Sequence, residues 1–236
     1  MTDTGTPIGR RVFLGLIGAG AAGVLVGGKV SEWLSNVASP VVSKDATGLS
    51  SLLPLEGFRF YTVTDGFPHK AAADYRLTVK GLVDKPLTLT YDEIRAMPAT
   101  RLTKDFQCVT GWRVRQTHWT GVLLSDLLDR AGVQPSARAV RFTSFDGVYT
   151  ESLTLGQARR RDVIVAYDLE DKPLSSDHGG PVRLYVSPMY GYKSCKWLDG
   201  IEVGDRVVPG YWEGEGYDVD AWVGRSNGRD DPATSS

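Results

Sequence analysis

The sequence predicts a single α+β domain, built from mixed β-sheets and short helices and preceded by a targeting segment. From Phe58 onward, short apolar runs of strand length alternate with brief amphipathic stretches. We find no internal repeat and no second block of composition. The chain has 236 residues, of which 42% are hydrophobic and 23% charged, which is ordinary for one well-buried domain.

Residues 1–38 carry the pattern of an export signal. The pair Arg10-Arg11 precedes Phe13-Leu14, and the uncharged run 12–28 follows. A basic start before a modestly apolar stretch is typical of a signal peptide, and paired arginines indicate the twin-arginine route. We therefore expect a periplasmic or extracytoplasmic protein. Cleavage near Ala38 stays open, and an uncut segment is long enough to anchor the protein in a membrane.

The same segment offers one alternative interpretation. Residues 18–23 fit the G-x-G-x-x-G pattern of a dinucleotide-binding turn, and Asp45 lies about twenty residues further on. The chain after Asp45 does not continue as alternating strands and helices, which favours the export signal.

The remaining chain divides into a linker at 39–57, a folded domain at 58–209 and a C-terminal tail at 210–236. A strand is predicted from Tyr75 to Val79. A capping box at Thr90–Glu93 predicts a short helix that Pro98 ends, and an apolar stripe predicts a second helix at 122–128 that Gly132 stops. Further strands are predicted at 140–143, 163–167, 182–186 and 201–203.

Charge and ligand content exclude several classes of function. The formal net charge of -1 provides no broad positive field, so we expect no nucleic-acid partner. With two cysteines and three histidines and no C-x-x-C or H-E-x-x-H pattern, a structural zinc site and covalent haem are disfavoured. Any metal is therefore expected to arrive inside an organic cofactor.

Cys108 is the candidate metal ligand, in the segment Asp105–Trp112. Considered alone, a cysteine at the end of a strand is more often a buried apolar residue. In an exported protein, a disulfide between Cys108 and Cys195 is a second alternative. A metal ligand ranks third on the residues alone.

Three ordered motifs change that ranking. They are 167–174 (YDLEDKPL), 177–184 (DHGGPVRL) and 191–198 (GYKSCKWL). Together with Gln107-Cys108, this order resembles the molybdopterin-binding domain of the sulfite oxidase family over roughly 58–207. The resemblance implies a sulfite-oxidase-type molybdopterin-binding fold and molybdenum-molybdopterin as cofactor. It also implies that Cys108 is the protein's ligand to the metal, and a thiolate is the soft ligand that such a metal prefers.

The resemblance also implies roles for individual residues. Tyr167 matches a tyrosine near the metal and is the second catalytic candidate, although a half-buried strand aromatic is an equal alternative. The cofactor would be held by Arg183 and Lys196 on its phosphate and by His178 on its pterin. The other predicted cofactor contacts are Arg59, Thr62, Val63, Ser144, Ser194 and Cys195.

The match departs from true sulfite oxidases at the substrate. Their first strand has an arginine in an R-N-H context, whereas this chain reads Tyr61-Thr62-Val63-Thr64. The closer resemblance is to the bacterial periplasmic branch, which includes catalytic subunits of protein-methionine-sulfoxide reductases. It implies a monomer that reduces an S-oxide or N-oxide, on a small molecule or a protein, with electrons from a membrane cytochrome. Sulfite oxidation and a non-catalytic, membrane-anchored binding module are the alternatives.

Overall fold

The computed structural model describes residues 57–232, all within the unit Pro54–Ser236. The predicted export signal at 1–38, the glycine-rich alternative at 18–23 and the linker up to residue 56 lie outside the described residues. Within 57–232, no helix has the length and apolar character needed to cross a membrane.

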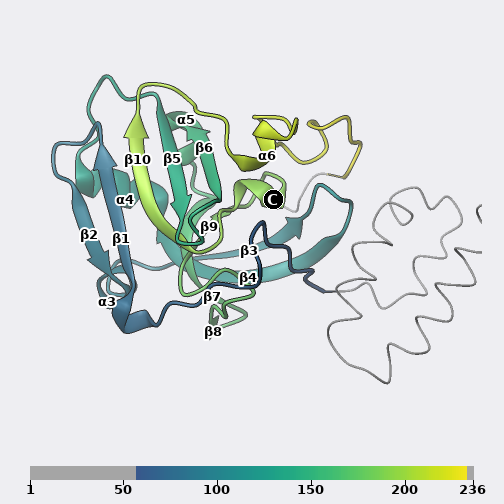
Figure 1. The fold of residues 1–236 in the computed structure, drawn as a ribbon, viewed down its shortest axis with the longest axis horizontal. Helices are drawn as coiled ribbons and strands as arrows, with labels where there is room; N and C mark the ends of the chain where they lie inside the picture. Colours follow the sequence, from purple (N-terminus) through teal and green to yellow (C-terminus); the bar gives the residue numbers. More distant parts are fainter. Residues whose placement is uncertain (1–56, 233–236) are drawn as a thin grey trace, which may run out of the picture. The chain divides into compact units, whose positions relative to one another are not determined.

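The first sheet has five strands and mixed pairing (Figure 1). Its β1 and β10 strands run parallel, and every other neighbouring pair is antiparallel. In sheet order the strands are β2 (Leu87–Thr90), β1 (Arg76–Gly81), β10 (Leu198–Gly204), β5 (Ala139–Ser144) and β6 (Thr150–Thr154). Strand β10, near the end of the domain, is thus the central strand and pairs with the first strand, β1.

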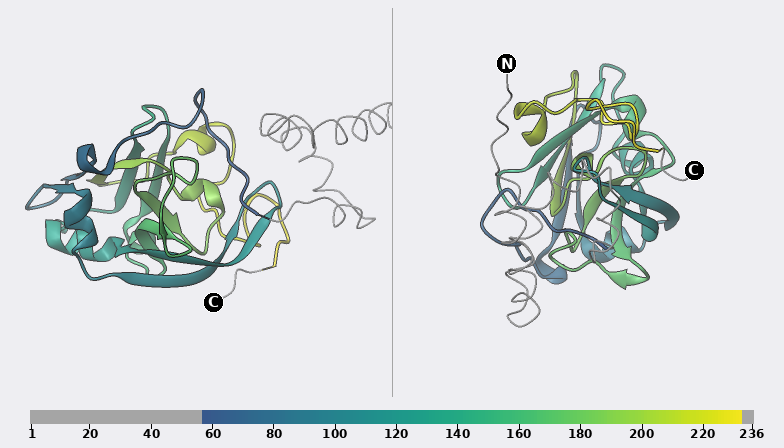
Figure 2. Two further views of the ribbon diagram at one scale, coloured as in Figure 1. Left: turned by 90° about the horizontal axis from the view of Figure 1, so that it is seen from below. Right: turned by 90° about the vertical axis from the view of Figure 1, so that its right-hand side faces the viewer.

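The second sheet is antiparallel throughout. It consists of β3 (Thr100–Gln107), β4 (Arg113–Leu123), β7 (Val163–Leu169), β8 (Lys172–Pro173) and β9 (Arg183–Val186), which pairs with β7. The long β3–β4 hairpin curves along one edge of the molecule and extends past the first sheet (Figures 1 and 2). The turn at the end of this hairpin carries Cys108.

The helices are short, as the sequence predicts. Thr90 caps α3 with both hydrogen bonds of the predicted capping box, and Gly132 ends α4 in the left-handed conformation with φ 70°. The apolar stripe predicted as a helix from Val122 begins instead at the end of β4, because Val122 and Leu123 still pair with β7. The helical elements are η2 (Ala72–Asp74), α3 (Tyr91–Arg95), α4 (Leu124–Ala131), α5 (Leu155–Ala158), η3 (Gly191–Lys193) and α6 (Tyr211–Gly214).

Two hydrophobic clusters lie on the two faces of the second sheet. Alternation along β7 shows the division, because side chains at i and i+2 on a strand share a face. Val163, Val165 and Tyr167 belong to the larger cluster, which also includes the first sheet. Ile164 and Ala166 belong to the second cluster. This second cluster includes Phe106, Trp112, Trp119 and Tyr185, with Phe58, Tyr61 and Cys108 packed against it.

Candidate functional site

Cys108 lies in a tight turn directly after β3. Its backbone N–H donates to Trp112 O at 2.9 Å, and Gly111 N–H donates back to Cys108 O at 3.0 Å. Gly111 has φ 106°, a conformation that favours glycine, so this residue permits the turn. The turn leaves the Cys108 side chain half-buried against the second cluster.

The two cysteines are both free thiols. The side chain of Cys195 is fully buried in the larger core, on the opposite side of the second sheet from Cys108. The alternative of a Cys108–Cys195 disulfide is therefore wrong. Cys195 can contribute to a ligand site only through its backbone.

Opposing effects act on the pKa of the Cys108 thiol. Burial raises its pKa, whereas a hydrogen bond from Thr110 Oγ1 at 3.2 Å and the positive charges of Arg229 and Arg59 lower it. Coordination to a metal removes the proton from a thiol outright. The residues around Cys108 thus supply both a soft ligand and cations that favour its anionic form.

A buried arginine lies on the same face of the sheet as Cys108. Arg183 is 4% exposed, and its guanidinium lies over the rings of Phe106 and Trp119 at 5.5 and 5.4 Å. It donates to His178 O at 2.7 Å and to Ser194 O at 2.8 Å, so it joins the two loops that carry the second and third motifs. Burial lowers its pKa to about 10.

Lys196 provides a second cation beside Arg183. Its Nζ donates to Tyr61 O at 2.5 Å and lies 4.3 Å from the centre of the Trp197 ring. Burial and then the charge of Arg183 lower the pKa of Lys196 to about 7. A buried lysine whose pKa is lowered by a neighbouring arginine is unfavourable in its charged form unless an anion binds near both.

Neither cation lies within ion-pair distance of a carboxylate of residues 57–232, although Asp177 and Asp146 are near enough to oppose the lowering of the Lys196 pKa. Both cations donate to backbone carbonyls instead. A buried charge without an opposite charge is expensive, and Arg and Lys are the usual phosphate ligands. The same described residues contain no group of three or more His, Cys, Asp or Glu that could hold a bare metal ion. This arrangement fits a cofactor that brings its own metal and an anionic phosphate.

His178, between β8 and β9, packs against two aromatic rings that belong to the segment before β1. Its ring is 5.0 Å from Phe58 and 4.7 Å from Phe60, both edge-on, and its Nδ1 lies 2.9 Å from Ser175 Oγ. Burial lowers its pKa, so the neutral imidazole is favoured. A neutral imidazole can donate or accept one hydrogen bond toward a pterin ring.

Two glycines, Gly179 and Gly191, allow the loops of the second and third motifs to pack closely against neighbouring side chains. A Cβ on Gly191 would lie 2.6 Å from the Phe106 ring, and one on Gly179 would lie 2.6 Å from Lys196 Cγ. The loop that starts at Gly191 therefore contacts β3 directly before Cys108. This contact brings the predicted phosphate ligands and the predicted metal ligand into one region.

The other predicted cofactor contacts lie around this region. Ser144 Oγ accepts from Asp146 N in the β5–β6 turn, and Phe145 N donates to Trp197 O beside Lys196. Ser194 Oγ accepts from Val186 N, while its backbone N–H donates to Gly191 O and its carbonyl accepts from Arg183, so its hydroxyl hydrogen is the group left to donate. Arg59, Thr62 and Val63 belong to the half-buried segment whose Tyr61 carbonyl accepts from Lys196.

Tyr167, like Cys195, is a predicted site residue that lies on the other side of the second sheet from Cys108. It faces the larger core, on the other side of β7, and the Arg95 guanidinium stacks on its ring at 4.5 Å. Alternation along the strand decides this placement. The motif match could not show which face the tyrosine would take.

Sequence reasoning missed a contribution from the C-terminal tail. Arg229 lies close enough to lower the pKa of Cys108, and its Nε donates to Asp231 at 3.1 Å. Asp231 in turn accepts from Tyr190 OH at 2.6 Å, and Arg113 donates to Pro232 O. A polar, glycine-containing tail carries no motif, so only these contacts could reveal it.

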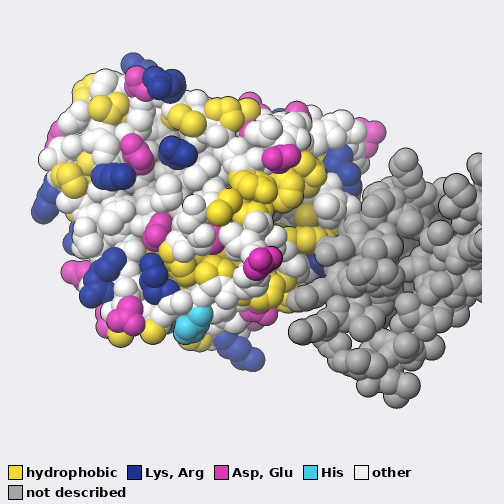
Figure 3. All heavy atoms as spheres, viewed as in Figure 1, with side chains coloured by type: hydrophobic (Ala, Val, Ile, Leu, Met, Phe, Trp, Pro, Cys, Tyr) yellow, Lys and Arg dark blue, Asp and Glu magenta, His cyan; other side chains and the backbone are white. Residues whose placement is uncertain are grey.

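Figure 3 shows how charge is distributed on one face of the molecule. Basic and acidic side chains are interspersed there, and hydrophobic side chains gather in the region below α6 in the same orientation as Figure 1.

The sequence is similar to those of several known oxidoreductases. The uncharacterized oxidoreductase YuiH of Bacillus subtilis is 35% identical over 150 residues, which are 63% of this chain and 75% of that protein. Mitochondrial sulfite oxidase of Drosophila melanogaster is 33% identical over 61% of this chain and 30% of its own. The protein-methionine-sulfoxide reductase catalytic subunit MsrP of Ralstonia nicotianae is 30% identical over 58% of this chain and 46% of its own.

A solved structure gives the same result for the fold. The sulfane dehydrogenase SoxCD of Paracoccus pantotrophus superimposes with a TM-score of 0.56 and 26% identity, over 61% of this chain and 41% of that chain. The oxidoreductase molybdopterin binding domain matches residues 65–212. The chain therefore belongs to this family of molybdopterin-dependent oxidoreductases, which includes the sulfite oxidases, and its cofactor is molybdenum-molybdopterin.

Proposed function

We propose that this protein transfers an oxygen atom reductively, from an S-oxide or N-oxide substrate, in a two-electron reaction at molybdenum. The observation that carries the proposal is the free thiol of Cys108 at the end of β3, on the same face of the sheet as the buried Arg183, whose guanidinium lies 5.5 Å from the Phe106 ring. Lys196 lies next to Arg183, and neither cation forms an ion pair with a carboxylate among the described residues. The MsrP relative, named for protein-methionine-sulfoxide reduction, supports the direction. Sulfoxide reduction consumes two electrons and two protons and yields a thioether and water.

Each residue has a distinct task in this proposal. The Cys108 thiolate ligates the metal, which supplies a Lewis acid and a two-electron couple when the cofactor is bound. Arg183 and Lys196 bind the phosphate, and His178 contacts the pterin. Phe58 and Phe60 pack edge-on against the imidazole ring of His178. The aromatic side chains of the second cluster keep water away from this side of the site.

A specific observation favours sulfite oxidation as the second candidate. The arginine that sulfite oxidases carry in their first strand is missing, but Arg59 and Arg229 place positive charge near Cys108. A charge-assisted hydrogen bond to an anion stabilises binding by about 1.5–3 kcal/mol. Arg229 could therefore replace the missing cation for an anionic substrate.

The remaining parts of the proposal concern the cellular setting. We propose export by the twin-arginine route, a periplasmic or extracytoplasmic location and a monomer, with a membrane cytochrome as the electron donor. The first 38 residues support export through their paired arginines. Either a small molecule or a protein-bound methionine sulfoxide is a suitable substrate class.

The decisive experiment is a pair of assays on the holoenzyme from a molybdopterin-competent host. Reduced viologen is supplied with methionine sulfoxide or trimethylamine N-oxide in one assay, and sulfite is supplied with ferricyanide in the other. We expect turnover of the oxides, and its loss in Cys108→Ala. Turnover of sulfite alone would reject the reductive proposal, and full oxide turnover by Cys108→Ala would remove Cys108 from the mechanism.

A further inference from the structure

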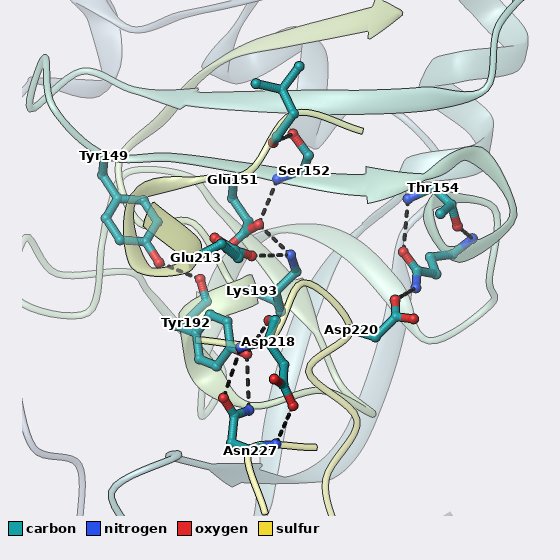
Figure 4. Close-up of polar contacts among 12 residues, drawn as sticks. Tyr149, Glu151, Ser152, Thr154, Tyr192, Lys193, Glu213, Asp218, Asp220 and Asn227 are labelled. Atoms are coloured by element: carbon teal, nitrogen blue, oxygen red, sulfur yellow. Dashed lines mark hydrogen bonds and ion pairs between the residues drawn. The ribbon is translucent and has the colours of Figure 1, made fainter. Parts of the chain in front are cut away.

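A buried cluster of three charged groups lies beside the cofactor loop (Figure 4). Lys193 is in η3, Glu151 is in β6 and Glu213 is in α6. The three side chains are at most 1% exposed. Lys193 Nζ donates to Oε1 of Glu213 at 2.6 Å and to Oε1 of Glu151.

The charges of this cluster do not balance if all three groups are ionised. Two carboxylates and one ammonium would leave a buried net charge of -1. The second oxygens, Oε2 of Glu151 and Oε2 of Glu213, are buried and have no hydrogen-bond partner. A carboxyl proton placed between these two side chains would satisfy both oxygens and neutralise the cluster.

Besides Lys193 and Glu213, the groups that face Glu151 are Tyr149, Tyr192 and Cys195, whose phenols and thiol are neutral near pH 7. The next positive charge, Arg183, acts on Tyr149 and Cys195, but it donates to His178 O and Ser194 O and to neither carboxyl of the cluster. Burial raises the pKa of Glu151 well above its ordinary value; the charge of Lys193 opposes this shift, and the adjacent Glu213 carboxyl adds to it.

The cluster joins the cofactor loop to two distant segments. Lys193 directly precedes Ser194, and Lys196 follows three residues later in the same loop. Tyr149 OH donates to Tyr192 O, and Tyr192 OH donates to Asp218 O at 2.6 Å. The loop is therefore attached through its backbone and through Lys193 to both β6 and the chain around α6.

Glycine at position 210 makes room for this arrangement. Gly210 precedes α6, and a Cβ there would lie 2.8 Å from Glu213 Oε2 and 2.4 Å from Thr150 O. The start of α6 thus packs closely against β6, and the carboxyl groups of Glu151 and Glu213 are buried between these two elements.

We propose that Glu151 and Glu213 share one proton, and that the neutral cluster they form with Lys193 holds the cofactor loop in its binding position. These three are positioning residues, because they act on the cofactor through Ser194 and Lys196. Loss of the shared proton at high pH would leave a buried net negative charge and release α6 from the loop.

The sign of the pH effect follows from proton binding. The folded state holds the Glu151 proton above the pH at which the unfolded chain releases it. Stability from this group is therefore complete below the ordinary carboxyl pKa and falls as pH rises toward the folded pKa of Glu151. Each pH unit in that interval raises the unfolding equilibrium constant about tenfold.

The first test compares the full-length holoenzyme with Glu151→Gln. The amide keeps the acceptor for Lys193 and donates an N–H toward Glu213, so it imitates the protonated acid. We expect the unfolding constant of the wild type, divided by that of the variant, to rise about tenfold per pH unit above the ordinary carboxyl pKa. Other titrating groups such as Lys196 contribute to both proteins and cancel in this ratio. A ratio that does not change between pH 5 and 9 would overturn the shared proton.

The second test uses Glu151→Gln combined with Glu213→Gln. This variant leaves the Lys193 ammonium buried without a carboxylate, so its stability should rise with pH as Lys193 loses its proton. A slope equal to that of Glu151→Gln would contradict the charge balance proposed for the cluster.

The third test addresses the cofactor loop. We measure bound molybdenum and pterin after dialysis of the Lys193→Met holoenzyme, with Lys80→Met as the control because Lys80 forms only an exposed ion pair with Glu202. We expect loss of cofactor from Lys193→Met and none from Lys80→Met. Full retention by a folded Lys193→Met would overturn the positioning role, whichever substrate the enzyme uses.

Discussion

The lowered pKa of Lys196 predicts that cofactor binding depends on pH. Without a bound anion, burial and the neighbouring Arg183 lower the pKa of Lys196 to about 7, compared with 10.5 for a free lysine. A phosphate bound at Lys196 opposes both effects by supplying the missing negative charge, so it raises this pKa again. Binding above pH 7 therefore requires the uptake of a proton by Lys196.

The magnitude follows from this linkage. While the pH lies between the pKa of Lys196 without the bound anion and its pKa with the anion bound, each unit of pH weakens cofactor binding by about tenfold. Between pH 7 and pH 9 we therefore expect affinity to fall by about a hundredfold. Below pH 7, Lys196 is already charged and its contribution to binding no longer changes.

The assay follows release of the pterin by fluorescence from holoenzyme that is diluted at a series of pH values. Lys196→Arg keeps the charge at all these values, so its release should not change between pH 7 and 9. Lys196→Gln should bind weakly at every pH. Wild-type affinity that is equal at pH 7 and pH 9 would refute the assignment of Lys196 to the phosphate.

Three further predictions concern single residues. Cys108→Ala should reduce oxygen-atom transfer by more than about a hundredfold, since even partners outside the metal's own ligands change metal sites by 10–100-fold; metal content and activity are measured together. Tyr167→Phe should change activity by less than about twofold, because the ring faces Arg95 and not Cys108, and steady-state kinetics decide this. Gly179→Ala should destabilise the fold by about 1–2 kcal/mol, because Gly179 has φ 91° and a Cβ would press on Lys196, and denaturant unfolding measures it.

Much of the local structure could be predicted from the sequence. The helix after Thr90 begins where its capping box lies, because the two reciprocal hydrogen bonds involve only neighbouring residues. Gly132 ends α4 for an equally local reason. The helix predicted at 122–128 starts two residues later, at Leu124, since Val122 and Leu123 pair with β7. That pairing joins distant segments and leaves no trace in local periodicity.

The candidate site shows the same division. The family and the cofactor were predictable, because ordered motifs specify which chemical groups are present; the role of Cys108 as metal ligand stays a prediction. The face of β7 taken by Tyr167, the contribution of Arg229, and the buried cluster of Lys193 with two glutamates were not predictable.

By itself, the sequence determined the class of chemistry: one thiol in a turn, an arginine and a lysine in glycine-containing motifs, and too few ligands for a bare metal. The tertiary structure alone decided that Arg183 and Lys196 are buried together without a carboxylate partner among the described residues. The physical reason is that charge becomes costly only when folding removes it from water, and burial depends on contacts between segments far apart in the chain.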